Sequence, residues 1–322
     1  MKENKFPKIL LEAIKYFSDE DNALELMVKL RWPDGITCPH CESKEYSFIS
    51  TRRFWKCKSC KKQFRAKVGT IMEDSPIGLD KWLSAIWMIA NCKNGVSSYE
   101  IHRALGITQK SAWFLLHRIR LAMQNGSFLL SGEVEADETF IGGKARNMHK
   151  SKREKLIQGR GAVGKAIVVG ALERGGRVKA QVVPDREEKT LHGVIRENVE
   201  HKSILFSDAW KSYNGLYPDF VHKVINHAEA YVNGNIHTNG IENFWSLLKR
   251  GLKGTYVSVM PFHLFRYVDE QSFRFNNRKS NDATRFLLAA KQITGRRLTY
   301  DKLTGKTLMR GDEGYTASLY PL

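Results

Sequence analysis

Three carboxylates in the C-terminal half of the chain stand where they could bind divalent cations. Asp137 lies in an alternating apolar run, Asp208 closes a short apolar run that starts at residue 204, and Glu242 begins a helical pattern. Carboxylates on three elements can hold two metal ions, which act on the attacking and leaving oxygens of a phosphoryl displacement. Mg²⁺ (or Mn²⁺) suits such a site because it binds few protein carboxylates and completes its shell with water and substrate phosphates.

Spacing alone does not identify these acids as a site. The chain contains 34 Asp and Glu residues, so unrelated surface acids also form triples with similar spacing. A nearby cation strengthens the interpretation, because Lys249 follows Glu242 by two helical turns and shares its face. Lys249 would contact a DNA phosphate there, although an exposed lysine on a solvated face has the same spacing.

The charge balance indicates a polyanionic partner. Lys and Arg number 52 against 34 Asp and Glu, which gives a formal net charge of +18 over 322 residues. A globular chain this basic most often binds nucleic acid. A membrane-spanning helix needs an apolar run of about 18 residues, and no run in this sequence approaches that length. Charges interrupt the apolar N-terminal stretch, so we expect no signal peptide.

Four cysteines in two Cys-x-x-Cys pairs predict a zinc site. Cys38 and Cys41 are separated from Cys57 and Cys60 by 15 residues. Each pair makes a tight turn that aims both sulfurs at one tetrahedral Zn²⁺. The residues between the pairs alternate like two strands, which is typical of a zinc ribbon. A redox dithiol is the alternative, but two matched pairs without a βαβ pattern argue against it.

The predicted ribbon carries cations interleaved with aromatic residues. Arg52, Arg53 and Lys56 surround Phe54 and Trp55. Basic side chains of this kind neutralise DNA phosphates, so we expect the three cations to contact the DNA backbone. The two aromatic residues fit either a nucleic-acid surface or the small core of the ribbon.

Residues 78–127 predict a helix-turn-helix module. Two helices are separated by a glycine-containing turn, and the first of them opens on the capping box of Ser97 and Glu100. The second helix spans 109–123. The alternative is an ordinary helical packing module with no role in recognition.

The second of these helices carries the candidate DNA-reading residues. In a helix-turn-helix the first residues of the second helix meet base edges, which makes Gln109 and Lys110 candidates for base contact. Arg118, two turns further along, is a third candidate for DNA binding.

After residue 126 the pattern changes to strands. The periodicity predicts strands at 132–141, 162–172, 178–183, 204–207 and 219–224, and helices at 189–199, 210–217, 240–252 and 261–275. Three hairpin-like strands followed by a helix and then β-α-β-α is the order of a ribonuclease-H-like fold. Residues 144–160 are very basic and lack apolar periodicity, so they predict either a mobile loop that orders on DNA or an idle solvated loop.

These segments predict an α+β multidomain protein. An N-terminal zinc ribbon and a helix-turn-helix precede a ribonuclease-H-like α/β catalytic domain. The expected divisions are a helical lead-in at 1–30, the ribbon at 31–70, the helix-turn-helix module at 78–127, the catalytic domain at 131–290 and a tail at 291–322.

Six features of the sequence together resemble one family. CPHC and CKSC, the helix-turn-helix pattern, and then EADETFIGG, FSDAWKSY and HTNGIENFWSLLKRGLKG are similar to the IS1595 (ISXO2-like) family of bacterial insertion-sequence transposases. The likeness spans about residues 32–277. It implies a transposase of the DD(E/N) type that binds the terminal inverted repeats of its element, cuts there and joins the ends to target DNA.

The resemblance also implies roles for individual residues. Asp137 and Asp208 match the first two catalytic acids, and Glu242 matches the third, with Lys249 at the usual offset. Relatives vary between Glu and Asn at the third position, so Asn239 is a neighbouring candidate. The implied cofactors are Zn²⁺ and Mg²⁺ (or Mn²⁺).

The implied partner is double-stranded DNA, both element ends and target, bound by a homo-oligomer in the nucleoid of a bacterial cytoplasm. A metal-dependent nuclease or resolvase of the same fold is one alternative function. A zinc-ribbon DNA-binding regulator without catalysis is another.

Overall fold

The chain forms two compact units in a computed structural model that describes residues 6–124, 126–143, 149–151, 154, 164–208, 213, 215–225 and 237–306. The first unit combines the chain up to Gln124 with the segment that begins at Asn277, and the second ends at Asn276. No described helix has the length and apolar character needed to cross a membrane. Each unit is described separately below.

The first unit is mostly helical, with a small antiparallel sheet. The sheet has the strand order β1-β2-β3 and lies next to the four cysteines. Trp55 and Phe64, on adjacent strands, stack with their ring centroids 5.8 Å apart, so the aromatic residues form the ribbon's core. The elements are α1 (Leu10–Ser18), α2 (Glu20–Arg31), β1 (Tyr46–Ile49), β2 (Phe54–Cys57), β3 (Gln63–Phe64), α3 (Leu79–Asn91), α4 (Ser98–Leu105), α5 (Gln109–Ala122), α10 (Asp282–Ala290) and α11 (Tyr300–Leu303).

Local capping signals set the bounds of α4 and α5. The Ser97 side chain accepts from the Glu100 amide while the Glu100 carboxylate accepts from the Ser97 amide, a complete capping box. Gly106 ends α4 at φ +59°, a left-handed conformation that glycine adopts without a steric penalty. Thr108 then accepts from the Ser111 amide and begins α5. The two helices and the turn between them therefore form where the sequence predicts.

Residues 277–306 pack with the first unit, although the sequence analysis assigned 277–290 to the catalytic domain and 291–322 to a tail. The Phe286 ring on α10 lies 5.2 Å from that of Phe17 and 5.4 Å from that of Trp87, between centroids. An amphipathic helix buries its apolar stripe wherever a matching core is available, and here α1 and α3 supply that core.

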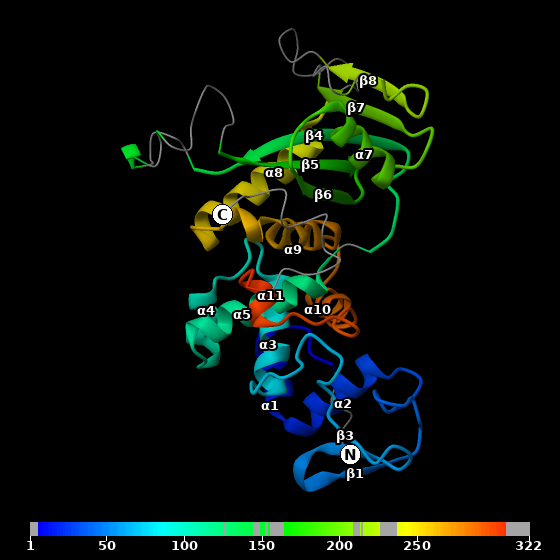
Figure 1. Cartoon of the computed structure of the whole chain (residues 1–322), viewed down its shortest axis with the longest axis vertical. Helices are drawn as coiled ribbons and strands as arrows, with labels where there is room; N and C mark the ends of the chain where they lie inside the picture. The colour runs from blue at the N-terminus through cyan, green and yellow to red at the C-terminus, as the bar shows by residue number, and fades with distance from the viewer. Residues whose placement is uncertain are drawn as a thin grey trace. The chain divides into compact units, whose positions relative to one another are not determined.

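The second unit is a five-stranded mixed sheet with helices on both faces (Figure 1). The strand order is β6-β5-β4-β7-β8. β4, β5 and β6 pair antiparallel, whereas β4, β7 and β8 run parallel. Its elements are β4 (Glu133–Ile141), β5 (Ala166–Glu173), β6 (Val178–Val183), α7 (Glu188–Asn198), β7 (Ile204–Asp208), β8 (Val221–Ile225), α8 (Asn239–Gly251), a π-helical turn (Leu252–Tyr256), a 3-10 turn (Pro261–His263) and α9 (Leu264–Asn276).

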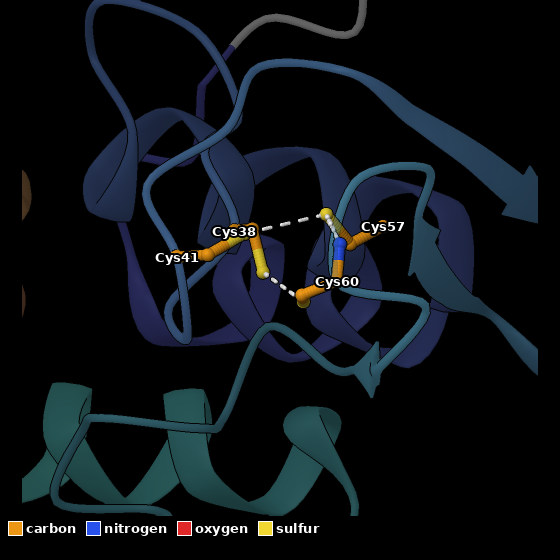
Figure 2. Close-up of side chains that lie close together, drawn as sticks. All are labelled: Cys38, Cys41, Cys57 and Cys60. Carbon is orange, nitrogen blue, oxygen red and sulfur yellow. Dashed lines mark hydrogen bonds between the residues drawn. The ribbon is translucent and has the colours of Figure 1, made fainter.

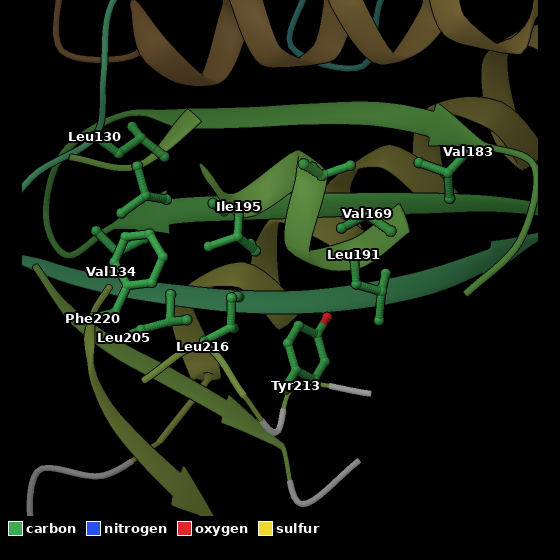
Figure 3. Packing of buried hydrophobic residues seen from close by; sticks show 14 residues of the cluster. Leu130, Val134, Val169, Val183, Leu191, Ile195, Leu205, Tyr213, Leu216 and Phe220 are labelled. Carbon is green, nitrogen blue, oxygen red and sulfur yellow. The ribbon is translucent and has the colours of Figure 1, made fainter. Parts of the chain in front are cut away.

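Alternation along β4 divides its side chains between two cores. Val134 and Ala136 are fully buried in the cluster that α7 covers with Leu191 and Ile195 (Figure 3). The opposite face packs against α8 and α9 and contains Glu135 and Asp137 among apolar neighbours. Odd-numbered residues of β4 therefore point to the side where α8 lies.

Some predicted segments lie outside the described residues. They comprise most of the basic loop 144–160, half of the predicted helix 210–217 and the end of the tail, 307–322. Tyr213, within the second of these segments, is described and is fully buried in the cluster beneath α7.

Candidate functional site

An open cavity of about 560 Å³ lies beside the middle of β4 and the carboxyl end of β7. Ala136 pairs with Ser207 at the end of this parallel ladder, so the next residues, Asp137 midway along β4 and Asp208 at the end of β7, lie side by side at the edge where β7 ends. This edge is where open α/β sheets place ligands. The lining residues are Asp137, Glu138, Thr139, Asp208, Thr238, Glu242, Trp245, Ser246 and Lys249.

The structure thus brings together four of the predicted site residues: Asp137, Asp208, Glu242 and Lys249. Glu242 and Lys249 project from the same face of α8, as their spacing predicts. Asn239, the first residue of α8, does not line the cavity.

Asp137 is held from the side of α8. The Trp245 indole Nε1 donates to Asp137 Oδ2 at 2.9 Å. Gly170, opposite Asp137 on β5, makes room for that ring, because a Cβ there would lie 2.7 Å from Trp245 Cη2. The tryptophan therefore both packs in the core and orients the carboxylate.

Burial and crowding act against ionisation of Asp137. Burial, followed by the charge of Glu138 and then that of Glu242, raises the pKa of Asp137 to about 7, although the Trp245 hydrogen bond opposes the shift. Burial lowers the pKa of Lys249, while the negative charge of Asp137 works in the other direction. A cavity that concentrates negative charge in this way favours a bound cation.

Glu138 also lines the cavity, although alternation points it to the α7 face of the sheet. The buried Tyr213 hydroxyl donates to Glu138 Oε2 at 2.9 Å, and burial raises the pKa of Glu138. Sequence alone did not indicate Glu138, because period-two alternation places neighbouring strand residues on opposite faces. The neighbouring strand β7 ends at Asp208, so beyond it residues from both faces of β4 line the same cavity.

Glu135 lies on the same strand face as Asp137 but not in the cavity. Its carboxylate is 1% exposed and accepts from Arg174 Nε at 3.1 Å and from the Ile241 amide at 2.9 Å. His237 Nδ1 is 3.3 Å from the same carboxylate. Glu135 is therefore fully engaged beneath the start of α8.

The four cysteines converge in the first unit (Figure 2). All four sulfurs lie within 4.8 Å of one another, and the Cys38–Cys60 and Cys41–Cys57 sulfur pairs are 3.7 and 3.6 Å apart. Sulfurs at a Zn–S distance of about 2.3 Å in a tetrahedron are about 3.8 Å apart, so the cluster fits Zn²⁺. The Cys60 amide lowers the pKa of the Cys57 thiol to about 6, which favours the thiolate that binds metal.

In the part of the chain that the structure describes, this cysteine cluster is the sole group of three or more metal-binding side chains within such a short range. The carboxylates of Asp137, Asp208 and Glu242 share one cavity but are spread more widely.

The proposed DNA-binding residues differ in their availability. Arg52, Lys56 and Lys110 are exposed. Arg53 forms ion pairs with Glu20 and Asp21.

Arg118 is the exception among these candidates, because it is 6% exposed. Its guanidinium donates to the carbonyl oxygens of Glu73 and Leu298. A buried guanidinium engaged by two backbone acceptors stabilises the first unit, so Arg118 is a packing residue rather than a surface for phosphate. The spacing of Arg118 could not reveal this, because Leu298 lies far along the chain.

Comparison with known proteins gives two family matches. Residues 129–276 match the ISXO2-like transposase domain, and residues 18–63 match the transposase zinc-ribbon domain. A Halobacterium salinarum protein, described as an uncharacterized protein in transposable element ISH50, is 25% identical over 252 residues, which cover 74% of this chain and 85% of that protein. An uncharacterized transposase-like protein of Haemophilus influenzae is 36% identical over 102 residues, or 31% of this chain and 82% of its own length.

The cysteine cluster generates a prediction about zinc content. Freshly purified protein should contain about one zinc ion per chain, and Cys57→Ser should lose it together with the stability that the metal contributes. Cys92→Ser is the matched control, because Cys92 lies outside the cluster. Elemental analysis by mass spectrometry makes the measurement. Wild-type protein without zinc, or Cys57→Ser with undiminished zinc, would contradict the assignment.

Asp137 generates a prediction about pH. Its pKa rises from 3.8 to about 7 on folding, so the folded protein binds an extra proton between these values. The free energy of unfolding of metal-free protein should therefore fall as pH rises through this range. Asp137→Asn should remove this decrease with pH. The variant should therefore have a free energy of unfolding about 2–4 kcal/mol above that of the wild type at pH 8, and about the same as the wild type at pH 4.

Urea denaturation of chelator-treated protein at both pH values checks this expectation. Glu200→Gln, which changes an exposed acid of the same unit, should leave the wild-type pH dependence in place. If Asp137→Asn gave the same difference at both pH values, the shifted carboxyl group would not be Asp137.

Proposed function

This chain belongs to the IS1595 family of ISXO2-like transposases, and on that basis we propose that it cuts the terminal inverted repeats of an insertion sequence and joins them to target DNA. The observation that carries this proposal is the shared cavity of Asp137, Asp208, Glu242 and Lys249. These side chains come from β4, β7 and α8, and they meet at an open sheet edge that a DNA strand can approach.

The arrangement of the second unit supports a ribonuclease-H-like catalytic domain. Three antiparallel strands are followed by two parallel ones, in the order β6-β5-β4-β7-β8, and helices cover both faces. The first two acids lie on adjacent parallel strands, each directly after the last residue of the ladder that joins them. The third acid comes from a helix that packs across β4 and β5.

Three carboxylates would hold two Mg²⁺ or Mn²⁺ ions here. Asp137 from β4, Asp208 from β7 and Glu242 from α8 would together hold these ions. Thr238 Oγ1 donates to Glu242 Oε1 at 3.1 Å and so helps to orient that carboxylate. Such ions activate the attacking oxygen and stabilise the leaving oxygen when bound.

The chemistry proceeds in two displacements at phosphorus. Water attacks the phosphodiester at the element end, and the bond from phosphorus to the 3′ oxygen breaks to leave a 3′-hydroxyl. That hydroxyl then attacks a target phosphodiester, so one P–O bond forms as one breaks. Lys249, beside Asp137, would hold a non-reacting phosphate oxygen and keep the strand in line.

The first unit would bind the DNA. Exposed Arg52 and Lys56 on the ribbon suit phosphate contact, while Gln109 and Lys110 at the start of α5 suit base edges if α4 and α5 act as a helix-turn-helix. Gln109 Nε2 donates to Ser98 Oγ at 2.8 Å, which holds the glutamine at the turn between the two helices. Because an element has two ends, we propose that a homo-oligomer acts on them in the bacterial nucleoid.

The carboxylates generate the central prediction. Asp137→Asn, Asp208→Asn and Glu242→Gln should each lower cleavage and joining of a labelled terminal-repeat duplex by at least about a hundredfold, because each removes a charge from a metal site. Binding of the same duplex should stay intact, since it belongs to the first unit. Double variants should be little worse than single ones, because the three acids act together.

Asp219→Asn is the matched control for these variants, because Asp219 pairs with Arg196 away from the cavity. If Glu242→Gln stayed active while Asn239→Ala did not, the third ligand would be the asparagine. Cleavage without joining by the wild-type protein would indicate a nuclease or resolvase. Binding without either reaction would indicate a regulator.

The ribbon generates a prediction about salt. Arg52→Gln with Lys56→Gln should reduce the slope of log Kd against log salt concentration by roughly 1.8, since each phosphate contact contributes about 0.9. Lys93→Gln with Lys291→Gln removes the same charge from exposed positions of the same unit outside the ribbon and should change the slope less. Equal slopes for the two double variants would mean that net charge, not the ribbon, governs binding.

A further inference from the structure

A buried carboxylate lies directly beneath the first turn of α8. Glu135 is 1% exposed, and its Oε2 accepts from the Ile241 amide at 2.9 Å. The first amides of a helix lack partners within the helix, and the helix dipole favours negative charge there. Glu135 therefore anchors the start of α8 to β4. The amide that it binds, that of Ile241, is one residue before Glu242 in the helix, and Glu135 itself is two residues before Asp137 in the strand.

Arg174, at the end of β5, connects this carboxylate to the other elements of the site. Its Nε donates to Glu135 Oε1 at 3.1 Å, and its Nη2 donates to the His237 carbonyl oxygen at 2.8 Å. The guanidinium also lies 3.8 Å from the ring centroid of Phe206, two residues before Asp208 on β7. One side chain thus contacts β4, β7 and the segment that leads into α8.

The start of α8 lies so close to β4 that only glycine fits at position 240 without a shift of neighbouring atoms. A Cβ at Gly240 would lie 2.7 Å from Glu135 Oε2 and 3.1 Å from Leu172 Cδ2. Gly240 is in ordinary helical conformation, so its value here is space and not backbone freedom. A larger residue would force either the buried Glu135 carboxylate or the start of α8 to move, and so would disturb the contact between them.

We propose that Glu135 and Arg174 are positioning residues, which fix the first turn of α8 so that Glu242 faces Asp137 and Asp208. The proposal rests on the proposed function, since it explains how three acids from separate elements keep their mutual geometry. A carboxylate this deeply buried is costly unless it is paired and fully hydrogen-bonded, so the arrangement is held in one geometry.

Glu133 provides an internal comparison. It also accepts from Arg174, through Nη1 at 3.2 Å, but its side chain is 45% exposed. Among the contacts of the described residues, Glu133 makes none to α8, whereas Glu135 bonds directly to the Ile241 amide. The two acids therefore share the arginine and differ in their link to the helix.

The test compares Glu135→Gln with Glu133→Gln in zinc-loaded, full-length protein. Hydrogen–deuterium exchange without Mg²⁺ or Mn²⁺ should show the amides at the start of α8 exchanging about tenfold faster in Glu135→Gln, because a charged acceptor is replaced by a neutral one. Calorimetric titration should show Mn²⁺ binding weakened about ten- to a hundredfold. Glu133→Gln should match the wild type in both measurements.

Gly240→Ala reaches the same contact from the helix side. Alanine favours a helix at this position, so the variant should fold, yet its methyl group displaces the helix from Glu135. It should reproduce the faster exchange and the weaker Mn²⁺ binding. Glu135→Asp, which keeps the charge, should show the same defects as Glu135→Gln, because the shorter side chain cannot reach the Ile241 amide.

The outcomes separate this inference from the proposed function. If wild-type protein binds Mn²⁺ and transfers strands but Glu135→Gln behaves like Glu133→Gln, the positioning role is wrong and the proposed function stands. If wild-type protein shows no strand transfer while the exchange and Mn²⁺ effects appear, the positioning role stands and the proposed reaction is wrong. Loss of stability in Glu135→Gln with unchanged Mn²⁺ affinity would reduce Glu135 to a core residue and overturn the inference.

Discussion

The parallel pairing of β4 with β7 is the constraint on which the candidate site depends. Its register, Ala136 opposite Ser207, brings the next residues of both strands to one edge of the sheet, although they are 71 positions apart in the chain. A register shift by one residue would move one carboxylate to the other face of the sheet. The buried, branched side chains of both strands hold that register, so the apolar core beneath α7 determines where the acids lie.

Charge is concentrated in the cavity at a cost to the folded protein. Burial and neighbouring acids oppose the ionisation of Asp137, and Trp245 returns only one hydrogen bond to it. Ionised Asp137 is unfavourable in metal-free protein, and the cation of the proposed mechanism would offset that cost. Glu135 differs from Asp137, because its charge is compensated within the protein by the opposite charge of Arg174 and by a hydrogen bond from the Ile241 amide. In the proposed mechanism, two acids that are two residues apart on one strand face thus have different roles, Glu135 a structural one and Asp137 a chemical one.

The first unit depends on chain segments from both ends of the sequence. The segment after Asn277 returns to pack α10 against α1 and α3, and Arg118 reaches the Leu298 carbonyl oxygen from α5. Helices that carry candidate base-reading residues are thereby held by parts of the chain that follow the second unit. A truncation before α10 would remove core contacts of the first unit and not a dispensable tail.

The amino-acid sequence by itself determined the elements whose signals are local. The Cys-x-x-Cys pairs, the capping box at Ser97, the turn at Gly106 and the spacing of Glu242 and Lys249 all act within a few residues, and the structure contains each of them. Only the tertiary structure decided the roles that depend on distant partners. It buried Arg118, engaged Glu135 beneath α8, brought Glu138 to the cavity and joined residues 277–306 to the first unit. A side chain's neighbours across the core, and hence its exposure and charge, are set by long-range packing that residue spacing does not encode.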